Sequence, residues 1–277
     1  MSTRTIGPEL VAAFKRLRLG GLLPTLPDRL TMAEKHNTPL EDVLLMLLAD
    51  EISRRESTAA SRRAEQAELD PDMVIERWDK SAKVTYDKRV FNELASLRFV
   101  EDHRNVVILG PVGVGKTFLA SALGHLCCRA GFSVRFQRVD ELLRILKQSR
   151  MDNSRDALMT ELATVDVLII DDFALEPMTR DESRDIYQLF VERNARFSTI
   201  VTSNRDTAEW IAAFDDALLA QSAVDRFKNN AFDLLVDGES YRPRLKPNID
   251  TIGPPPSAPV RKPPAQPGRR RAAHRGR

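Results

Sequence analysis

Short apolar runs alternate with longer amphipathic segments in the second half of the chain. The runs are typical of strands, and they lie at Val106–Leu109, Ser133–Gln137, Val165–Ile170, Thr199–Thr202 and Phe232–Val236. The segments between them have the spacing of helices, and they lie at Lys116–Arg129, Asp140–Gln148, Thr179–Ala195 and Asp216–Lys228. Strands that alternate with helices predict an α/β fold with a parallel five-stranded sheet covered on both faces.

Two local features support this prediction. The run Val165–Ile170 is almost entirely apolar, as expected for a central strand that is buried on both faces. The third helical segment begins with Thr179 and Glu182, whose spacing is that of a capping box at a helix N-terminus.

The N-terminal part has a different pattern. From Leu40 to Ile52 apolar side chains recur three and four residues apart, and the following turns are rich in Ala and Arg. We therefore expect a small helical N-terminal domain over residues 1–70, a connector over 71–104 and the α/β core over 105–250.

The last stretch, residues 251–277, cannot form a core. It holds seven prolines mixed with Arg, Ala and Gly, so we expect it to be disordered. It also holds seven Lys or Arg and no acidic residue, so its net charge is +7. Because the formal net charge of the whole chain is +2, residues 1–250 have a net charge of −5. Net charge therefore does not indicate nucleic-acid binding by the folded part, although the tail could attract DNA in a salt-dependent way.

Composition also points to a compartment. The two cysteines, Cys127 and Cys128, are adjacent and make no disulfide framework, which favours a reducing environment. No apolar run resembles a signal peptide, and the longest cluster, Val43–Ala49, is far shorter than the ~20 residues of a membrane helix. We expect a cytoplasmic protein with no membrane partner.

One motif carries the strongest chemical signal. A G-x-x-x-x-G-K-[ST] sequence follows the first apolar run and is formed by Gly110, Pro111, Val112, Gly113, Val114, Gly115, Lys116 and Thr117. Glycines let the backbone curve so that successive N–H groups surround phosphates, and the next helix points its N-terminus at them. We expect Lys116 to bind the β- and γ-phosphates of ATP and Thr117 to hold Mg²⁺.

Two carboxylates follow the buried strand. In an open α/β sheet, ligands bind beyond the carboxyl ends of the strands, so Asp171 and Asp172 should face the phosphates. We expect Asp171 to hold the Mg²⁺ and Asp172 to polarise the attacking water. The alternative is a solvated junction between strand and loop.

Three further residues are candidates for the same site. Asn204 lies two residues after the strand Thr199–Thr202 and could orient the water, or it could simply cap the segment that starts at Asp206. Arg226 could complete the site of a neighbouring subunit as an arginine finger, or it could be a surface residue paired with Asp225. Arg242 is a weaker candidate for a γ-phosphate sensor.

These elements together resemble AAA+ P-loop ATPases of the DnaA/DnaC branch, and within it the IstB family of transposase helpers. The resemblance covers residues 10 to 245 and includes, besides the P-loop, Leu17-Arg18-Leu19, Leu40 to Arg55, Phe99-Val100-Glu101, Ile170-Asp171-Asp172-Phe173, Thr202-Ser203-Asn204, Asp225-Arg226-Phe227 and Gly238-Glu239-Ser240-Tyr241-Arg242.

The resemblance implies an oligomer that binds duplex DNA, deforms it and passes it to a partner transposase. ATP would lie between subunits, with Lys116 and Asp171 on one side and Arg226 on the other. The helical N-terminal domain would contact DNA or the partner. Candidate DNA-contacting residues form two groups, each of which could also be an ordinary polar face: Arg54, Arg55, Arg62 and Arg63, and Arg144, Lys147, Arg150 and Arg155.

Other functions remain open at this point. A DnaC-like helicase loader would share the chemistry but have a different partner. A small-molecule P-loop kinase would need an arginine-rich lid, whereas the Asp171-Asp172 pair and Arg226 favour hydrolysis. A nucleotide-gated binding module with little turnover would use ATP only to stabilise the oligomer. A GTPase is disfavoured because the chain has no Asn-Lys-x-Asp segment.

Overall fold

The structure, a computed structural model, describes residues 5–245. The chain up to Tyr241 forms one compact unit, and a second unit begins at Arg242 with the short 3-10 helix η4 (Arg242–Leu245). The predicted disordered tail, residues 251–277, lies outside the described residues.

The centre of the first unit is a six-stranded sheet. Its strands are β1 (Val84–Tyr86), β2 (Asn105–Leu109), β3 (Val134–Arg138), β4 (Val167–Asp171), β5 (Ser198–Ser203) and β6 (Ala231–Gly238), in the order β1-β6-β2-β5-β4-β3. The five predicted strands are all present and parallel to one another. The prediction of a five-stranded, wholly parallel sheet is wrong in one respect, because β1 adds an antiparallel edge strand beside β6. With three residues, β1 is too short to give a periodic signal.

Helices connect the parallel strands. They are α6 (Lys116–Ala130), α7 (Val139–Met151), α8 (Arg155–Thr164), α9 (Arg180–Arg193), the 3-10 helix η3 (Thr207–Ala213) and α10 (Ala217–Lys228). The four predicted helices are confirmed, and so is the capping box, in which Thr179 and Glu182 bond to each other's backbone N–H. Sequence reasoning missed α8, which turns the chain back toward β4.

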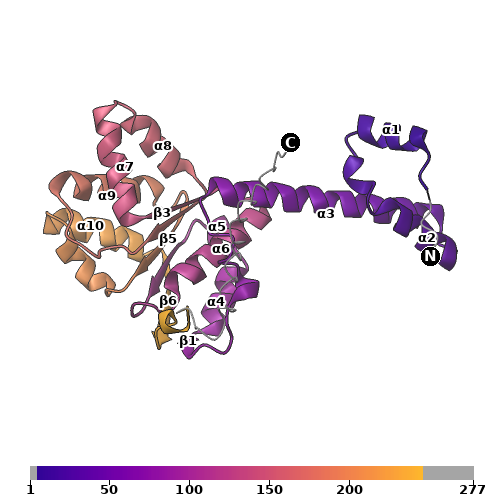
Figure 1. The fold of residues 1–277 in the computed structure, drawn as a ribbon. Coiled ribbons are helices and arrows are strands. Elements are labelled where there is room, and N and C mark those ends of the chain that lie inside the picture. Colours follow the sequence, from indigo (N-terminus) through magenta and orange to yellow (C-terminus); the bar gives the residue numbers. More distant parts are fainter. Residues whose placement is uncertain (1–4, 246–277) are drawn as a thin grey trace, which may run out of the picture. The chain divides into compact units, whose positions relative to one another are not determined.

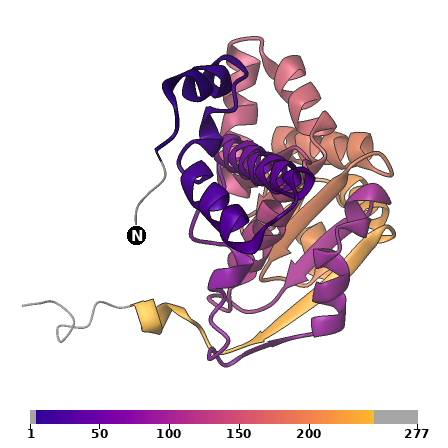
Figure 2. The same cartoon turned by 90° about the vertical axis from the view of Figure 1, so that its right-hand side faces the viewer.

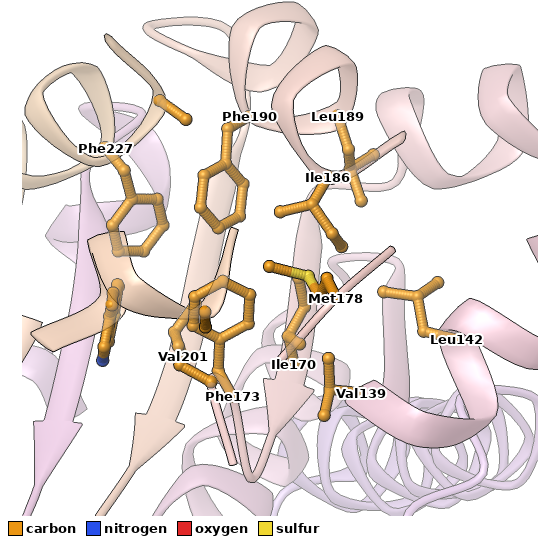
Figure 3. Close-up of a cluster of buried hydrophobic side chains, with 14 of the residues drawn as sticks. Val139, Leu142, Ile170, Phe173, Met178, Ile186, Leu189, Phe190, Val201 and Phe227 are labelled. Carbon is orange, nitrogen blue, oxygen red and sulfur yellow. The ribbon is translucent and has the colours of Figure 1, made fainter. Parts of the chain in front are cut away.

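Helices cover both faces of the sheet (Figure 1), and each face has its own apolar core. Consecutive strand residues alternate between them. Leu168 and Ile170 belong to the core formed with α7 and α9, in which Figure 3 labels Ile170, whereas Val167 and Ile169 belong to the core formed with α6. All four are fully buried, which explains why the strand has an unbroken apolar run rather than an alternating one. This double coverage holds the carboxyl ends of the strands at one rigid edge.

The N-terminal residues are helical, as predicted, and form α1 (Pro8–Arg16), η1 (Gly20–Leu22), α2 (Leu26–His36) and the 27-residue α3 (Leu40–Gln66), which Figure 2 views almost along its axis. The first half of α3 closes a small core with Leu22 and Leu26. The last turns pack on α6, where Arg63 donates to the Cys128 carbonyl at 2.8 Å.

The predicted connector contains η2 (Ile75–Arg77), β1, α4 (Lys88–Ala95) and α5 (Arg98–Glu101). Helices α4 and α5 contribute side chains to the core on the α6 face of the sheet. The division into residues 1–70, 71–104 and 105–250 stays a prediction. In the part of the chain that the structure describes, no helix is long and apolar enough to cross a membrane.

Candidate nucleotide-binding site

The loop between β2 and α6 has the curved backbone that the motif requires. Gly113 and Gly115 have φ values of 86° and 98°, in the region that favours glycine. A Cβ atom on Gly113 would lie 2.2 Å from the Ser240 hydroxyl, so the loop and the segment after β6 leave no room for a side chain. The loop then leads directly into α6, whose first N–H groups lack helical partners and are suited to bind an anion.

The lysine of the loop is held inside it. Lys116 is 6% exposed, and its ammonium donates to the carbonyls of Gly110 and Pro111 at 2.8 Å each. The charge therefore lies where the loop curves, within reach of any phosphate that the loop surrounds. Pro111 and Val112 form the outer part of the loop, and Val112 is exposed whereas Val114 is buried.

A carboxylate and two hydroxyl groups meet at the end of β4. The Thr117 hydroxyl lies 3.0 Å from both oxygens of Asp171, and the Thr202 hydroxyl donates to the same carboxylate. Burial raises the pKa of Asp171, and the hydrogen bond from Thr202 opposes this. The structure thus brings the two predicted metal ligands, Thr117 and Asp171, into direct contact.

This donor set fits Mg²⁺. Both side chains offer oxygen, and the described residues contain no cluster of three acidic, His or Cys side chains that would bind a cation by themselves. Mg²⁺ is usually held by one or two protein oxygens together with water and substrate phosphates. A metal here would depend on the nucleotide for its remaining ligands.

Asp172 turns away from the strand. Its φ is 57°, a left-handed conformation that costs energy for a residue other than glycine, and its N–H donates to the Thr202 hydroxyl at 3.0 Å. The carboxylate is half-buried and lies 3.8 Å from Arg138, at the end of β3. The Asp172 side chain is 39% exposed and is therefore accessible to a bound molecule.

Asn204 lies near the start of the loop. It is exposed at the end of β5 and lines an open hollow of about 210 Å³ together with Gly110 and Pro111. The simpler interpretation, in which Asn204 caps the next helix, is wrong, because the Asp206 side chain accepts the capping bond from Ala208.

Arg226 lies on α10, away from its own phosphate loop. The structure places its guanidinium on Tyr187 of α9, donating to the hydroxyl at 3.1 Å with the ring centroid 5.9 Å away. The pairing with Asp225 that the sequence suggested is replaced by this contact. Arg242 lies in η4, in the second unit, and its role stays a prediction.

Sequence reasoning missed an aromatic hollow beside the loop. A cavity of about 130 Å³ lies between Trp78, Phe118 and Tyr241 and reaches Gly115. The Trp78 and Phe118 rings meet edge to face at 5.3 Å, and the Tyr241 N–H donates to the Gly113 carbonyl at 2.8 Å. The one available signal was weak: Trp78 is one of only two tryptophans in the chain and lies in the segment leading to β2.

Most of the arginines proposed to contact DNA are engaged in the fold. Arg54 and Arg55 form salt bridges with the buried carboxylate of Glu51, and Arg63 donates a hydrogen bond to a backbone carbonyl of α6. Arg150 and Arg155 both bond Asp185, which is 1% exposed.

The other candidates lie closer to solvent. Arg144 pairs with Glu141, while Arg62 and Lys147 are exposed. Neither group is a continuous basic face, so the polar-face interpretation fits these helices better.

Comparisons with known proteins give relatives over most of the chain. It is 36% identical over 245 residues to an ATP-binding protein of an insertion sequence in Mycobacterium tuberculosis, covering 88% of this chain and 98% of that protein. It is 34% identical over 238 residues to the ATP-binding protein of the insertion sequence IS21 from Pseudomonas aeruginosa, covering 86% and 90%.

Solved structures show the same fold. The DnaI structure matches with a TM-score of 0.51 and 22% identity, over 59% of this chain and 90% of that one. The replication initiator DnaA bound to AMPPCP and single-stranded DNA matches with a TM-score of 0.50 and 20% identity, over 62% and 51%. The profile of the IstB-like ATP-binding proteins matches residues 12–248. The chain therefore belongs to the IstB-like ATP-binding protein family, and its fold is that of an AAA+ P-loop ATPase.

Proposed function

We propose that this ATPase is the helper of a transposase, which assembles on duplex DNA with ATP between protomers and hydrolyses ATP during transposition. The observation that carries the proposal is the contact of Thr117 with Asp171 beside the Lys116 loop, in a chain whose full-length relatives belong to insertion sequences. The protein would act in the cytoplasm, where the DNA of an insertion sequence lies.

Each residue of the site has a proposed role. The loop amides and Lys116 would bind the triphosphate, and Thr117 and Asp171 would hold Mg²⁺, which when bound neutralises charge on the phosphates. Asp172 would accept a proton from the attacking water, and Asn204 would orient that water. The strained backbone of Asp172 supports its role, because such strain clusters at functional sites.

Asp172→Asn is expected to leave ATP bound but to slow hydrolysis, by on the order of 10²–10⁴-fold in kcat. The amide keeps the size of the side chain, but it replaces one acceptor oxygen with an NH₂ donor and is not a base. Steady-state turnover and ATP titration measure the two effects separately, with Asp156→Asn on the exposed side of α8 as the control. A wild-type kcat in Asp172→Asn would assign the base elsewhere.

We further propose that the aromatic hollow binds the adenine base. It adjoins the phosphate loop at Gly115, and its walls are Trp78, Phe118 and Tyr241, whose rings suit a flat heterocycle. Trp78→Ala is expected to weaken ATP binding by about 1–3 kcal/mol, whereas Trp78→Phe should retain most of the affinity. Calorimetric titration with ATP and with inorganic triphosphate checks this, because only ATP affinity should fall. Equal losses for both ligands would count against a base site.

Arg226 is proposed to act on ATP held by the neighbouring protomer. Its place on α10, away from its own loop, suits a residue that serves another subunit. We expect Lys116→Ala and Arg226→Ala proteins each to be inactive, and their mixture to regain turnover, since one supplies the arginine and the other the intact loop. A mixture no more active than the sum of its parts would contradict a role in trans.

The proposed function as a whole is tested by duplex DNA binding with and without nucleotide. Binding at fixed salt should strengthen with a non-hydrolysable ATP analogue, because ATP joins the protomers that bind the DNA together. An affinity that does not depend on nucleotide would leave only the salt-dependent attraction of basic segments. The runner-up function, a helicase loader, predicts stimulation of ATP turnover by a replicative helicase rather than by a transposase.

A further inference from the structure

One buried residue at the end of β5 contacts the whole turn that follows β4. Thr202 is 0% exposed, and its hydroxyl donates to the Asp171 carboxylate at 2.5 Å. The same hydroxyl accepts the N–H of Asp172 at 3.0 Å, and the Thr202 carbonyl accepts the N–H of Phe173 at 2.8 Å. A hydroxyl group can donate one hydrogen bond and accept others, so Thr202 uses both capacities on the two aspartates of the site.

Asp172 is held by a side chain because it lies beyond the paired part of β4. The register of β4 with β5 ends where Ile170 lies opposite Val201. Two residues later the backbone of Asp172 has a φ of 57°, a conformation that persists only where its surroundings hold it. Loss of the Thr202 hydroxyl would take away the acceptor of the Asp172 N–H and leave the strained conformation less well held.

The second contact of the hydroxyl limits rotation of the Asp171 carboxylate. The oxygen Oδ1 accepts from Thr202, and both carboxylate oxygens lie 3.0 Å from the Thr117 hydroxyl, the other proposed metal ligand. The bond from β5 therefore keeps the carboxylate beside Thr117. Mg²⁺ demands nearly ideal octahedral geometry, and hydrogen bonds to a metal ligand fix its orientation, so a ligand held in this way suits that ion.

We propose that Thr202 is a positioning residue for ATP hydrolysis: its buried hydroxyl orients the Asp171 carboxylate for Mg²⁺ and holds the strained backbone of Asp172. The inference rests on the proposed function, in which Asp171 binds the metal and Asp172 is the base. Thr202 has no exposed surface with which to touch the nucleotide, so it acts through the two aspartates. Asn204 differs from it, because Asn204 is exposed and lines the hollow beside Gly110.

Thr202→Val removes the hydroxyl and keeps the other contacts of the turn. Valine has nearly the same shape, and its backbone carbonyl can still accept from Phe173. The Phe173 carbonyl accepts from the Ser203 hydroxyl at 2.8 Å, and that hydroxyl accepts from Trp210 at 3.2 Å. The variant should therefore fold, and its defects should be those of the two aspartates.

The first test is steady-state ATP turnover at saturating Mg²⁺. In Thr202→Val, kcat should fall by roughly 10–100-fold, since the hydrogen bonds to a charged carboxylate and to a strained backbone are both lost. Thr202→Ser keeps the hydroxyl and should restore kcat to within about 3-fold of the wild type. ATP binding in EDTA should be unchanged in both variants, because the phosphate loop, residues 110–117, does not include Thr202.

Thr199→Val is the matched control. Thr199 lies on the same strand, is 1% exposed and has a hydroxyl that accepts from Arg193 at 2.9 Å. It lies at the amino end of β5, whereas the site lies at the carboxyl end. Its loss should lower the urea midpoint at least as much as Thr202→Val does, because a buried guanidinium loses an acceptor, but kcat should be that of the wild type.

Metal affinity provides a readout that does not depend on turnover. Electron paramagnetic resonance measures Mn²⁺ binding to the full chain in the presence of a non-hydrolysable ATP analogue. The Mn²⁺ affinity should fall about 10-fold or more in Thr202→Val, as is typical when a partner of a metal ligand is removed. It should recover in Thr202→Ser and be unchanged in Thr199→Val.

Wild-type kcat and Mn²⁺ affinity in Thr202→Val would overturn the proposal. A serine variant as impaired as the valine variant, or an equal loss of kcat in Thr199→Val, would do so too. Lys116→Ala, assayed beside them, separates this failure from a failure of the proposed function. If Lys116→Ala loses turnover and Thr202→Val does not, only the inference about Thr202 is wrong, whereas a wild type that does not hydrolyse ATP would refute both.

Discussion

Lys116→Ala is expected to remove nearly all ATP binding and turnover. The ammonium is buried in the loop, where its attraction for phosphate is little screened by water, and α6 has no other cation in its first turn. Removing one partner of such a desolvated charge pair costs about 2–5 kcal/mol, or roughly 30-fold to several thousand-fold in kcat/KM. Titration with a fluorescent ATP analogue and a phosphate-release assay measure the two losses.

The matched control for that variant is Lys88→Ala. Lys88 is an exposed lysine that, like Lys116, begins a helix, but α4 does not follow a glycine-rich loop. Its loss should leave turnover unchanged. Wild-type ATPase activity in Lys116→Ala would show that nucleotide binding does not depend on this loop.

Arg193→Met is expected to destabilise the fold by about 3–5 kcal/mol. Arg193 is 1% exposed at the end of α9, and its guanidinium donates to the carbonyls of Leu162, Val165 and Ser198 and to the Thr199 hydroxyl. It thus joins the end of α8 to the start of β5, at the amino ends of the strands, whereas the site lies at their carboxyl ends. Methionine fills the space but leaves these buried acceptors without donors.

Urea unfolding followed by circular dichroism measures this change. Arg196→Met is the control, because Arg196 lies three residues further on and is exposed, so it should cost less than about 0.5 kcal/mol. Equal midpoints for the two variants would show that the buried hydrogen bonds contribute little net stability.

The burial of Arg193 could not be predicted from the sequence. In the sequence it is one of many arginines on a helix, and nothing local distinguishes it from Arg196. Its burial depends on the end of α8 and the start of β5, which meet it only in three dimensions. For the same reason, the start of β4 was placed two residues early: Val165 is apolar, but it caps α8 and its carbonyl accepts from Arg193.

The phosphate loop and the end of β4 were predictable because their signals are local. A strand, a glycine-rich turn and a helix occur in sequence order within 26 residues, and Asp171 directly ends a buried run. The topology of parallel strands then brings Thr117 to Asp171 without further information.

The aromatic hollow was not predictable in this way. Trp78, Phe118 and Tyr241 are far apart in sequence and none belongs to a periodic pattern that points to a ligand. Arg138 was missed similarly, since only the pairing of β3 with β4 places it beside Asp172.

The most direct test of the account is a crystal structure of the full chain with a non-hydrolysable ATP analogue and Mn²⁺, whose anomalous signal locates the metal. We predict phosphates surrounded by residues 110–117, with the Lys116 ammonium bound to them and the metal beside Thr117 and Asp171. An analogue bound elsewhere, or a metal distant from both side chains, would contradict an ATP-hydrolysing site at this loop.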